Sequence, residues 1–281
     1  MKVLQKISEI KDFQSESQYN GKVIGFVPTM GALHKGHISL VDQCVKECNV
    51  TIVSIFVNPL QFNNKDDFAK YPVTIESDLK MLEYSGCDIV FVPDVKEMYP
   101  DDKQVHYDLG EIETVMEGKF RPGHYQGVAR VVHILFDIVK PDKAYFGAKD
   151  YQQIMVIKRM TEITGIKSEI IICPTVREQD GLAMSSRNMR LTPLERKSAP
   201  AIYHALSQMP CIIRERGVSN GNYWFENYVN NIPFLKCEYI EVTDSETLMP
   251  VAVATKDKTL SVFVSVYCGN IRLIDNIFFV V

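Results

Sequence analysis

Short apolar runs alternate with helical stripes through the first part of the chain. Residues 22–27 (KVIGFV), 51–57 (TIVSIFV) and 88–92 (DIVFV) are rich in β-branched residues and predict buried strands. Apolar residues recur at helical spacing between Leu40 and Cys48, which predicts a helix between the first two strands. The same patterns predict four further elements: a helix with its buried stripe at 128–139, a strand at 144–146, a helix at 151–164 and a strand at 169–173.

This alternation predicts an α/β fold with a parallel sheet. Such a sheet is covered by helices on both faces, and ligands bind beyond the carboxyl ends of its strands. After Pro174 the alternation stops. The remaining patterns predict two helices and then three strands, at residues 194–207, 223–230, 238–242, 260–266 and 272–278. We therefore expect an α/β domain over residues 1–175 and a smaller α+β domain over residues 176–281.

Composition narrows the class of protein. Hydrophobic residues make up 46% and charged residues 23% of the 281 residues, as in globular proteins that bury their own core. The formal net charge of −4 gives no basic excess, which argues against a nucleic-acid partner and favours small substrates. No apolar run resembles a signal peptide or approaches the roughly 20 residues of a membrane helix. We therefore expect a cytoplasmic protein.

The cysteines and two histidines have structural interpretations. Seven scattered cysteines, an odd number, favour reduced thiols over a disulfide framework. Cys44 and Cys48 are spaced to place two metal ligands on one helix face, yet no second Cys/His pair follows at zinc-site spacing, so buried thiols are favoured. Cys173 is interpreted as a core residue and His133 as a packed helix histidine. His124 receives no catalytic step.

The segment from Pro28 to His37 (PTMGALHKGH), which we call the HKGH loop, is the main candidate for chemistry, because it joins the first strand to the following helix. Free backbone N–H groups and the positive end of the helix dipole favour an anion there, and glycines let a phosphate approach closely. His34 and His37, three residues apart, can share one helix face and donate to nucleotide phosphates. Surface histidines beside an ordinary turn are the less favoured alternative. The candidate nucleotide ligands are Met30, Gly31, Ala32, Leu33, His34, Lys35, Gly36 and His37.

Three other loops add polar candidates. Gln61 follows the second strand, and its amide can donate to or accept from a hydroxy acid, whereas Asn58 beside Pro59 is equally compatible with a turn. Lys149, in a glycine-containing loop between a strand and a helix, can neutralise phosphate charge; an exposed lysine is the alternative. Past the expected domain boundary, Met184, Ser185, Ser186 and Arg187 offer neutral donors and a guanidinium, or simply a turn.

Seven segments, in this order, resemble the pantothenate synthetase family of the HxGH nucleotidylyltransferase superfamily: PTMGALHKGH, FVNPLQF (56–62), YP (71–72), FRPGHYQGV (120–128), FGAKDYQQ (146–153), DGLAMSSRN (180–188) and RLIDN (272–276). The resemblance implies a Rossmann-like first domain. It assigns Gln61 and Gln153 to pantoate, with Gln61 also at the later β-alanine site. It assigns to ATP the loop Gly147, Ala148, Lys149 and Asp150, the backbone of Val176, and the phosphate signature Met184 to Arg187.

The resemblance also implies a reaction. (R)-Pantoate and β-alanine are condensed to pantothenate with release of AMP and pyrophosphate, through a pantoyl adenylate, with Mg²⁺ bound to ATP and a homodimeric enzyme. His34, His37, Lys149 and Arg187 are the expected catalytic residues, with His37 also a candidate proton donor. Asp78 is a candidate magnesium ligand. Two positions depart from the family pattern, since Ala148 replaces a usual glutamate and Val73 a usual arginine.

Rival functions explain less of the sequence. A nucleotidylyltransferase that transfers AMP or CMP to a phosphorylated acceptor explains the HKGH loop equally well, but it does not explain the glutamine motifs. A tRNA synthetase is disfavoured by the chain length and the missing basic surface. A catalytically silent nucleotide-binding module is disfavoured by the joint presence of both histidines, Lys149 and the MSSR segment.

Overall fold

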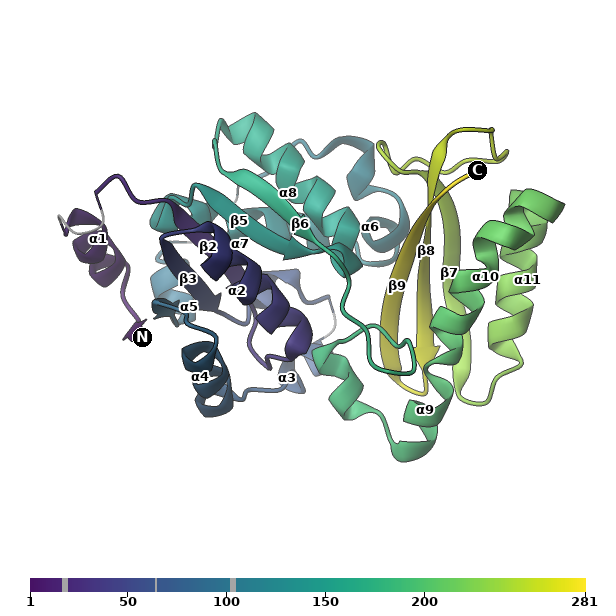
Figure 1. The fold of residues 1–281 in the computed structure, drawn as a ribbon, viewed down its shortest axis with the longest axis horizontal. Coiled ribbons are helices and arrows are strands. Elements are labelled where there is room, and N and C mark those ends of the chain that lie inside the picture. The colour runs from purple at the N-terminus through teal and green to yellow at the C-terminus, as the bar shows by residue number, and fades with distance from the viewer. Residues whose placement is uncertain (17–19, 64, 102–104) are drawn as a thin grey trace. The chain divides into compact units, whose positions relative to one another are not determined.

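The computed structural model describes residues 1–16, 20–63, 65–101 and 105–281 (Figure 1). The chain divides into two compact units, residues 1–113 with 121–174 and residues 114–120 with 175–281. This division differs from the expected one, because residues 114–120 leave the N-terminal unit and group with the C-terminal one. In the described parts of the chain, no helix is long and apolar enough to cross a membrane.

The first unit is built on a six-stranded sheet in the order β1-β4-β3-β2-β5-β6, and all of its pairs are parallel. The α/β prediction is therefore confirmed. The strands are β1 (Lys2–Leu4), β2 (Ile24–Thr29), β3 (Val50–Ile55), β4 (Ile89–Phe91), β5 (Lys143–Gly147) and β6 (Glu169–Cys173). Apart from β1, which lies at the edge beside β4, strands are added outward from β2 on one side and from β5 on the other. The loops that follow these two neighbours are thus adjacent at the switch point of the sheet, where α/β proteins bind ligands.

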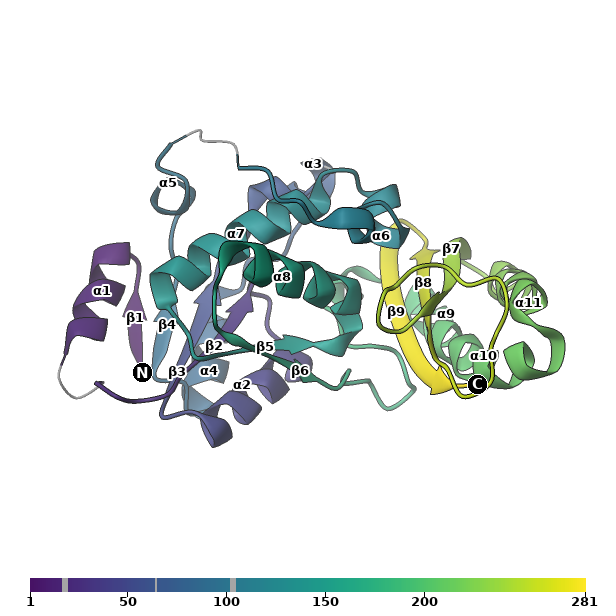
Figure 2. The same ribbon diagram turned by 90° about the horizontal axis from the view of Figure 1, so that it is seen from above.

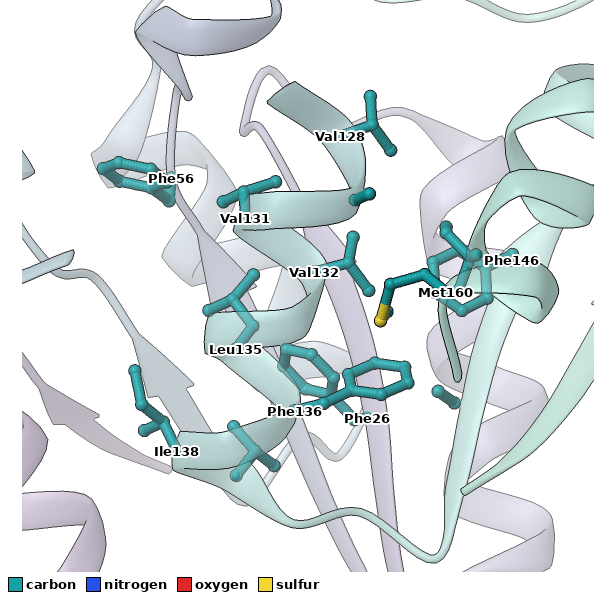
Figure 3. Packing of buried hydrophobic residues seen from close by; sticks show 14 of the residues in the cluster. Phe26, Phe56, Val128, Val131, Val132, Leu135, Phe136, Ile138, Phe146 and Met160 are labelled. Carbon is teal, nitrogen blue, oxygen red and sulfur yellow. The ribbon is translucent and has the colours of Figure 1, made fainter. Parts of the chain in front are cut away.

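Helices cover both faces of this sheet, as Figure 2 shows. One face carries α2 (Lys35–Glu47) and α4 (Ile75–Tyr84); the other carries α1 (Ile7–Ser15), α7 (His124–Val139) and α8 (Tyr151–Thr164). The strands read as continuous apolar runs because successive side chains point to opposite buried faces. Phe26 packs with the α7 side and Val27 with the α2 side. Figure 3 shows Phe26 beside Phe136 of α7, with ring centroids 6.2 Å apart.

Short elements connect these helices and strands. They are η2 (Pro59–Gln61), α3 (Lys65–Ala69), α5 (Val95–Met98), η3 (Gly110–Glu113) and η4 (Ala148–Asp150) in the first unit, and α6 (Met116–Phe120) and η5 (Ser186–Arg190) in the second.

The second unit confirms the α+β prediction. Its antiparallel sheet has the order β7-β8-β9, from Leu235–Asp244, Thr259–Cys268 and Ile271–Val280. Buried residues of α10 (Ala201–Arg216) and α11 (Val218–Asn230) form its core together with that sheet. The helix expected at 194–207 is divided into α9 (Pro193–Ser198) and α10, and α10 continues past the expected end with Pro210 inside it.

An ion-pair network places residues 114–120 in the second unit. Glu117 is only 6% exposed. Its carboxylate accepts hydrogen bonds from both terminal nitrogens of Arg272, at 2.7 and 2.6 Å, and from the hydroxyl of Tyr239 at 2.8 Å. Asp275, from the same RLIDN segment, accepts a bidentate pair from Arg177 at 2.6 and 2.9 Å. The charged residues of this segment therefore link parts of the second unit that are far apart in sequence.

The cysteines are reduced, as expected. All seven, within the described residues, are free thiols. Burial raises the pKa of Cys44 to about 12, which keeps it an unreactive thiol. A Cβ on Gly25 would lie 2.6 Å from the Cys48 sulfur, so these thiols fill the space above a glycine of β2. The described residues contain no group of three or more His, Cys, Asp and Glu side chains placed to hold a metal ion.

Candidate active site

The HKGH loop leaves β2 at the switch point and turns directly into α2. Gly31 has φ +78° and Ala32 φ +49°, so two successive residues are left-handed. The carboxylate of Asp78 in α4 accepts the backbone N–H groups of Ala32 and Leu33, each at 2.9 Å. The expectation that these N–H groups are free for phosphate is therefore wrong. Both oxygens of Asp78 thus hold the loop, and its interpretation as a magnesium ligand stays a prediction.

His34 and His37 lie on the first turn of α2, as predicted, with ring centroids 4.0 Å apart. His34 is the N-cap residue, and its Nδ1 accepts the backbone N–H of Gly36 at 3.2 Å. The Nδ1 of His37 accepts the backbone N–H of His34 at 3.4 Å. Because each Nδ1 is an acceptor, the proton of each neutral ring is on Nε2. The two half-buried rings therefore carry two N–H donors.

Both histidines are neutral at pH 7. Burial, followed by the charge of Lys149, lowers the pKa of His34 to about 4. Burial, the neighbouring His34 and Lys149 lower the pKa of His37 to about 3. A neutral imidazole gives up its remaining proton only at very high pH. In the free protein His37 is thus a hydrogen-bond donor, and its role as a proton donor in the reaction stays a prediction.

Lys149 lies in η4, between β5 and α8, and its charge lowers the pKa of both histidines. Its ammonium nitrogen is 3.7 Å from an Asp150 carboxylate oxygen, and only 17% of its side chain is exposed. The alternative of an exposed surface lysine is wrong. The structure thus brings His34, His37 and Lys149 together at the switch point, and Gly147 and Ala148 directly precede Lys149 in the sequence.

The Gln61 amide lies beside the HKGH loop. Its Nε2 is 3.1 Å from the sulfur of Met30, and its Oε1 accepts a hydrogen bond from Asn58 at 3.1 Å. Asn58 is 1% exposed and also binds Gly127 and Tyr99. Because Asn58 occupies the oxygen of Gln61, the amide faces the loop with its N–H donors. The sequence left Gln61 free to donate or accept, whereas the structure orients it as a donor.

The backbone of Gln61 is held by α7 and the residues before it. Its carbonyl accepts from His124 Nδ1 at 2.8 Å and from Arg121 at 3.2 Å, and Arg121 also donates to His124 Nε2 at 3.1 Å. A Cβ on Gly127 would lie 2.7 Å from the carbonyl carbon of Leu60. Sequence reasoning assigned no role to these residues, although Arg-Pro-Gly-His before an apolar helix marked the segment.

Gln153 lies on the first turn of α8, after η4. It is half-buried, and in the described ranges its amide makes no hydrogen bond. Its assignment to pantoate stays a prediction.

The candidates of the second unit form a turn of their own. The Val176 carbonyl accepts the backbone N–H of Met184 at 3.0 Å. The Ser185 hydroxyl caps η5 by accepting the backbone N–H of Arg187 at 3.2 Å, and Ser186 is buried. Because the capping bond uses the Ser185 oxygen as an acceptor, its O–H remains a donor. The assignment of Val176 and of Met184 to Arg187 to ATP stays a prediction.

The sequence as a whole matches one family. Residues 2–278 match the family described as Pantoate-beta-alanine ligase. A pantothenate synthetase from Porphyromonas gingivalis is 45% identical over 277 residues, which cover 99% of both chains. A pantothenate synthetase from Caldicellulosiruptor saccharolyticus is 47% identical over 279 residues, again covering 99% of both.

Solved structures agree with this match. A pantothenate synthetase from Thermus thermophilus superposes with a TM-score of 0.89 at 39% identity, covering 99% of both chains. A pantoate-beta-alanine ligase from Francisella tularensis, complexed with beta-gamma ATP and beta-alanine, superposes with a TM-score of 0.81 at 36% identity, covering 99% of this chain and 97% of that one.

Proposed function

The chain belongs to the pantoate-β-alanine ligase family and condenses pantoate with β-alanine using ATP, and we propose that the reaction passes through a pantoyl adenylate. The observation that carries this proposal is the pair of neutral imidazoles beside Lys149. Two Nε2–H donors and an ammonium group at a helix N-terminus suit a phosphorus centre whose negative charge grows during substitution.

The first step forms one bond and breaks another at the α-phosphorus. A pantoate carboxylate oxygen attacks, the bond to the bridging oxygen of the β-phosphate breaks, and pyrophosphate leaves with the electron pair. His34, His37 and Lys149 stabilise the charge on the phosphoryl oxygens. The N–H donors of Gln61 orient the acid, since they suit carboxylate and hydroxyl oxygens.

The second step makes the amide. The neutral amine of β-alanine attacks the acyl carbon, the carbon–oxygen bond to AMP breaks, and the amine loses a proton as AMP leaves. The mixed anhydride must be kept from water between the two steps. We propose that Gln153 binds pantoate, that Gly147, Ala148, Asp150 and Val176 line the nucleoside, and that Met184, Ser185, Ser186 and Arg187 bind its phosphates. This assignment is supported by the family match.

Magnesium is proposed to accompany ATP. Among the described residues no cluster of three acidic, histidine or cysteine side chains exists for it, and both oxygens of Asp78 accept hydrogen bonds from the HKGH loop. We propose an ion that would be held mainly by phosphate oxygens and water, as Mg²⁺ often is in nucleotide sites. The homodimer expected from the family resemblance and the expected cytoplasmic location stay predictions.

Isotope exchange tests the adenylate route. With pantoate and ATP but no β-alanine, labelled pyrophosphate should enter ATP, and addition of β-alanine should release AMP. Gln61→Ala should weaken pantoate-dependent exchange while ATP still binds, whereas Gln5→Ala at an exposed position should match the unchanged protein. Exchange that needs no pantoate, or release of ADP in place of AMP, would refute the proposal.

A further inference from the structure

Asp78 is a buried acidic residue outside the expected catalytic set. It lies in the first turn of α4, more than 40 residues from the HKGH loop in sequence, and its side chain is 1% exposed. We propose that Asp78 is a positioning residue for the nucleotide: its carboxylate fixes the HKGH loop in the conformation that aims both histidines at the α-phosphate. The inference rests on the proposed function of that loop.

Three hydrogen bonds tie the Asp78 carboxylate. Oδ2 accepts the backbone N–H of Ala32 at 2.9 Å, while Oδ1 accepts the backbone N–H of Leu33 at 2.9 Å and the hydroxyl of Thr74 at 3.0 Å. Hydrogen bonds to an ionised acceptor are stronger than neutral ones, and a buried carboxylate without partners is costly. The carboxylate and the loop therefore stabilise each other.

The backbone of the loop needs such support. Ala32 has a left-handed backbone, which a residue with a Cβ adopts only when its surroundings enforce it. Gly31, also left-handed, approaches so closely that a Cβ there would lie 3.1 Å from Asp78 Oδ2 and 3.1 Å from Ile55. The N–H groups of Ala32 and Leu33 thus donate to a carboxylate of the protein itself and not to a bound anion.

Asp78 affects the histidines through the loop backbone, because the residues that it fixes directly precede His34. Leu33, whose N–H binds Asp78, directly precedes His34, the N-cap residue of α2. The backbone N–H of His34 in turn donates to His37 Nδ1, which sets the proton of that ring on Nε2. A shift of the Ala32–Leu33 backbone would therefore misdirect both Nε2–H donors.

Two substitutions test the role of Asp78. Asp78→Asn presents at most one oxygen to the two N–H groups and points an amide N–H group at the other. Thr74→Val removes only the hydroxyl that donates to Asp78 and touches no other part of the loop contact. Glu76→Gln is the matched control, since this exposed residue on the same helix loses the same charge. Thr74→Val keeps the test available if Asp78→Asn fails to fold.

The measurement is the Kd for ATP by titration calorimetry, once with excess Mg²⁺ and once with EDTA. From the strength of charge-assisted hydrogen bonds, we expect Asp78→Asn to raise the Kd about tenfold or more in both buffers, and Thr74→Val to raise it about threefold. Glu76→Gln should leave the Kd unchanged. The number of ATP sites per chain in the titration should stay the same in Thr74→Val, whereas a general loss of folding would lower it.

Two results would overturn the inference, and a third would overturn the proposed function instead. A loss of affinity that disappears in EDTA would make Asp78 a metal ligand and overturn the inference. Unchanged Kd in both Asp78→Asn and Thr74→Val would also overturn it. If the unsubstituted protein bound no ATP in either buffer, the proposed function would fail instead, so the two failures are distinguishable.

Discussion

At the scale of single residues, the side-chain nitrogens of His34 and His37 carry the chemistry. Backbone N–H groups occupy both Nδ1 atoms, and burial beside Lys149 keeps both rings neutral. The rings thus resemble fixed dipoles more than acids. Preorganised donors of this kind stabilise charge without reorganisation during the reaction.

Two substitutions of His37 distinguish the roles of its two ring nitrogens. The amide nitrogen of glutamine reaches about as far as imidazole Nε2, whereas that of asparagine reaches only about as far as Nδ1. Loss of one donor to a developing charge costs about 10²- to 10³-fold in rate, so we expect that loss in the adenylation rate of His37→Asn. His37→Gln should retain much more activity in pyrophosphate exchange. Equal losses in both variants would show that Nε2 is not the donor.

The low pKa values of these histidines predict how stability depends on pH. The folded pKa is about 4 for His34 and about 3 for His37, below the ordinary 6.5 that each ring has when the chain unfolds. Between pH 6.5 and 4 the unfolded chain therefore binds more protons, so the free energy of unfolding falls as the pH is lowered through this window. At pH 5.5 the His37 share of the loss is roughly 1 kcal/mol.

Urea unfolding at several pH values measures this loss. Other groups titrate over the same range, so the relevant quantity is the difference between the unsubstituted protein and His37→Gln. The variant should lose less stability from pH 7.5 to 5.5. Parallel curves for the two proteins would contradict a neutral, half-buried His37.

Sequence reasoning found the candidate site residues but not the contacts that hold them in place. The histidines, Lys149 and Gln61 belong to short local patterns after strands. Asp78 acts on Ala32 and Leu33 from another helix, and Asn58 sets the amide of Gln61. These relations depend on which elements are neighbours in space. A single acidic residue within a helical segment gives no local sign of them.

At the scale of elements, the packing of α7 against η2 decides where Gln61 lies. Gly127 allows the helix to contact the Leu60 carbonyl, and His124 binds the carbonyl of Gln61 one residue later. The Gly127 carbonyl in turn accepts from Asn58. The helix and the loop are therefore joined by both packing and hydrogen bonds.

Gly127→Ala tests this packing. Alanine favours a helix over glycine by about 1 kcal/mol, so the substitution would stabilise α7 if space allowed. Its Cβ would instead meet backbone atoms of Leu60 and Gln61 and push the loop away. A displacement of that kind can cost about 10- to 100-fold, which we expect as a raised KM for pantoate with little change for ATP.

Gly165→Ala is the control for a general loss of stability. Gly165 is left-handed at the end of α8 with open space around it, so alanine there strains the backbone and leaves the site alone. Its melting temperature should fall while its KM for pantoate stays the same. An unchanged KM in Gly127→Ala would show that the contact does not position Gln61.

The elements with strong local patterns could be predicted from the sequence. The helix Tyr151–Thr164 and the strand Glu169–Cys173 match the expected bounds, with Gly165 as a left-handed stop between them. The helix α4 escaped prediction because its fully buried positions include only one large apolar residue, Leu82, beside Asp78. In α10, packing of residues beyond Pro210 against the second core outweighs the usual cost of an internal proline.

At the scale of the whole molecule, the chain contributes a segment of its first half to the second unit. Residues 114–120 join that unit because Glu117 pairs with Arg272, which is far away in sequence. No local pattern announces this pairing, so a single boundary near residue 175 was the natural expectation. The unit that carries the histidines and Gln61 is thus interrupted once along the chain.

The transfer of labelled oxygen tests the adenylate route most directly. Pantoate labelled with ¹⁸O in its carboxylate is converted with ATP and β-alanine, and the products are analysed by mass spectrometry or ³¹P NMR. Because the bond between the acyl carbon and oxygen breaks in the second step, one ¹⁸O atom should appear in AMP and none in pyrophosphate. Unlabelled AMP, or label in inorganic phosphate formed with ADP, would contradict the account.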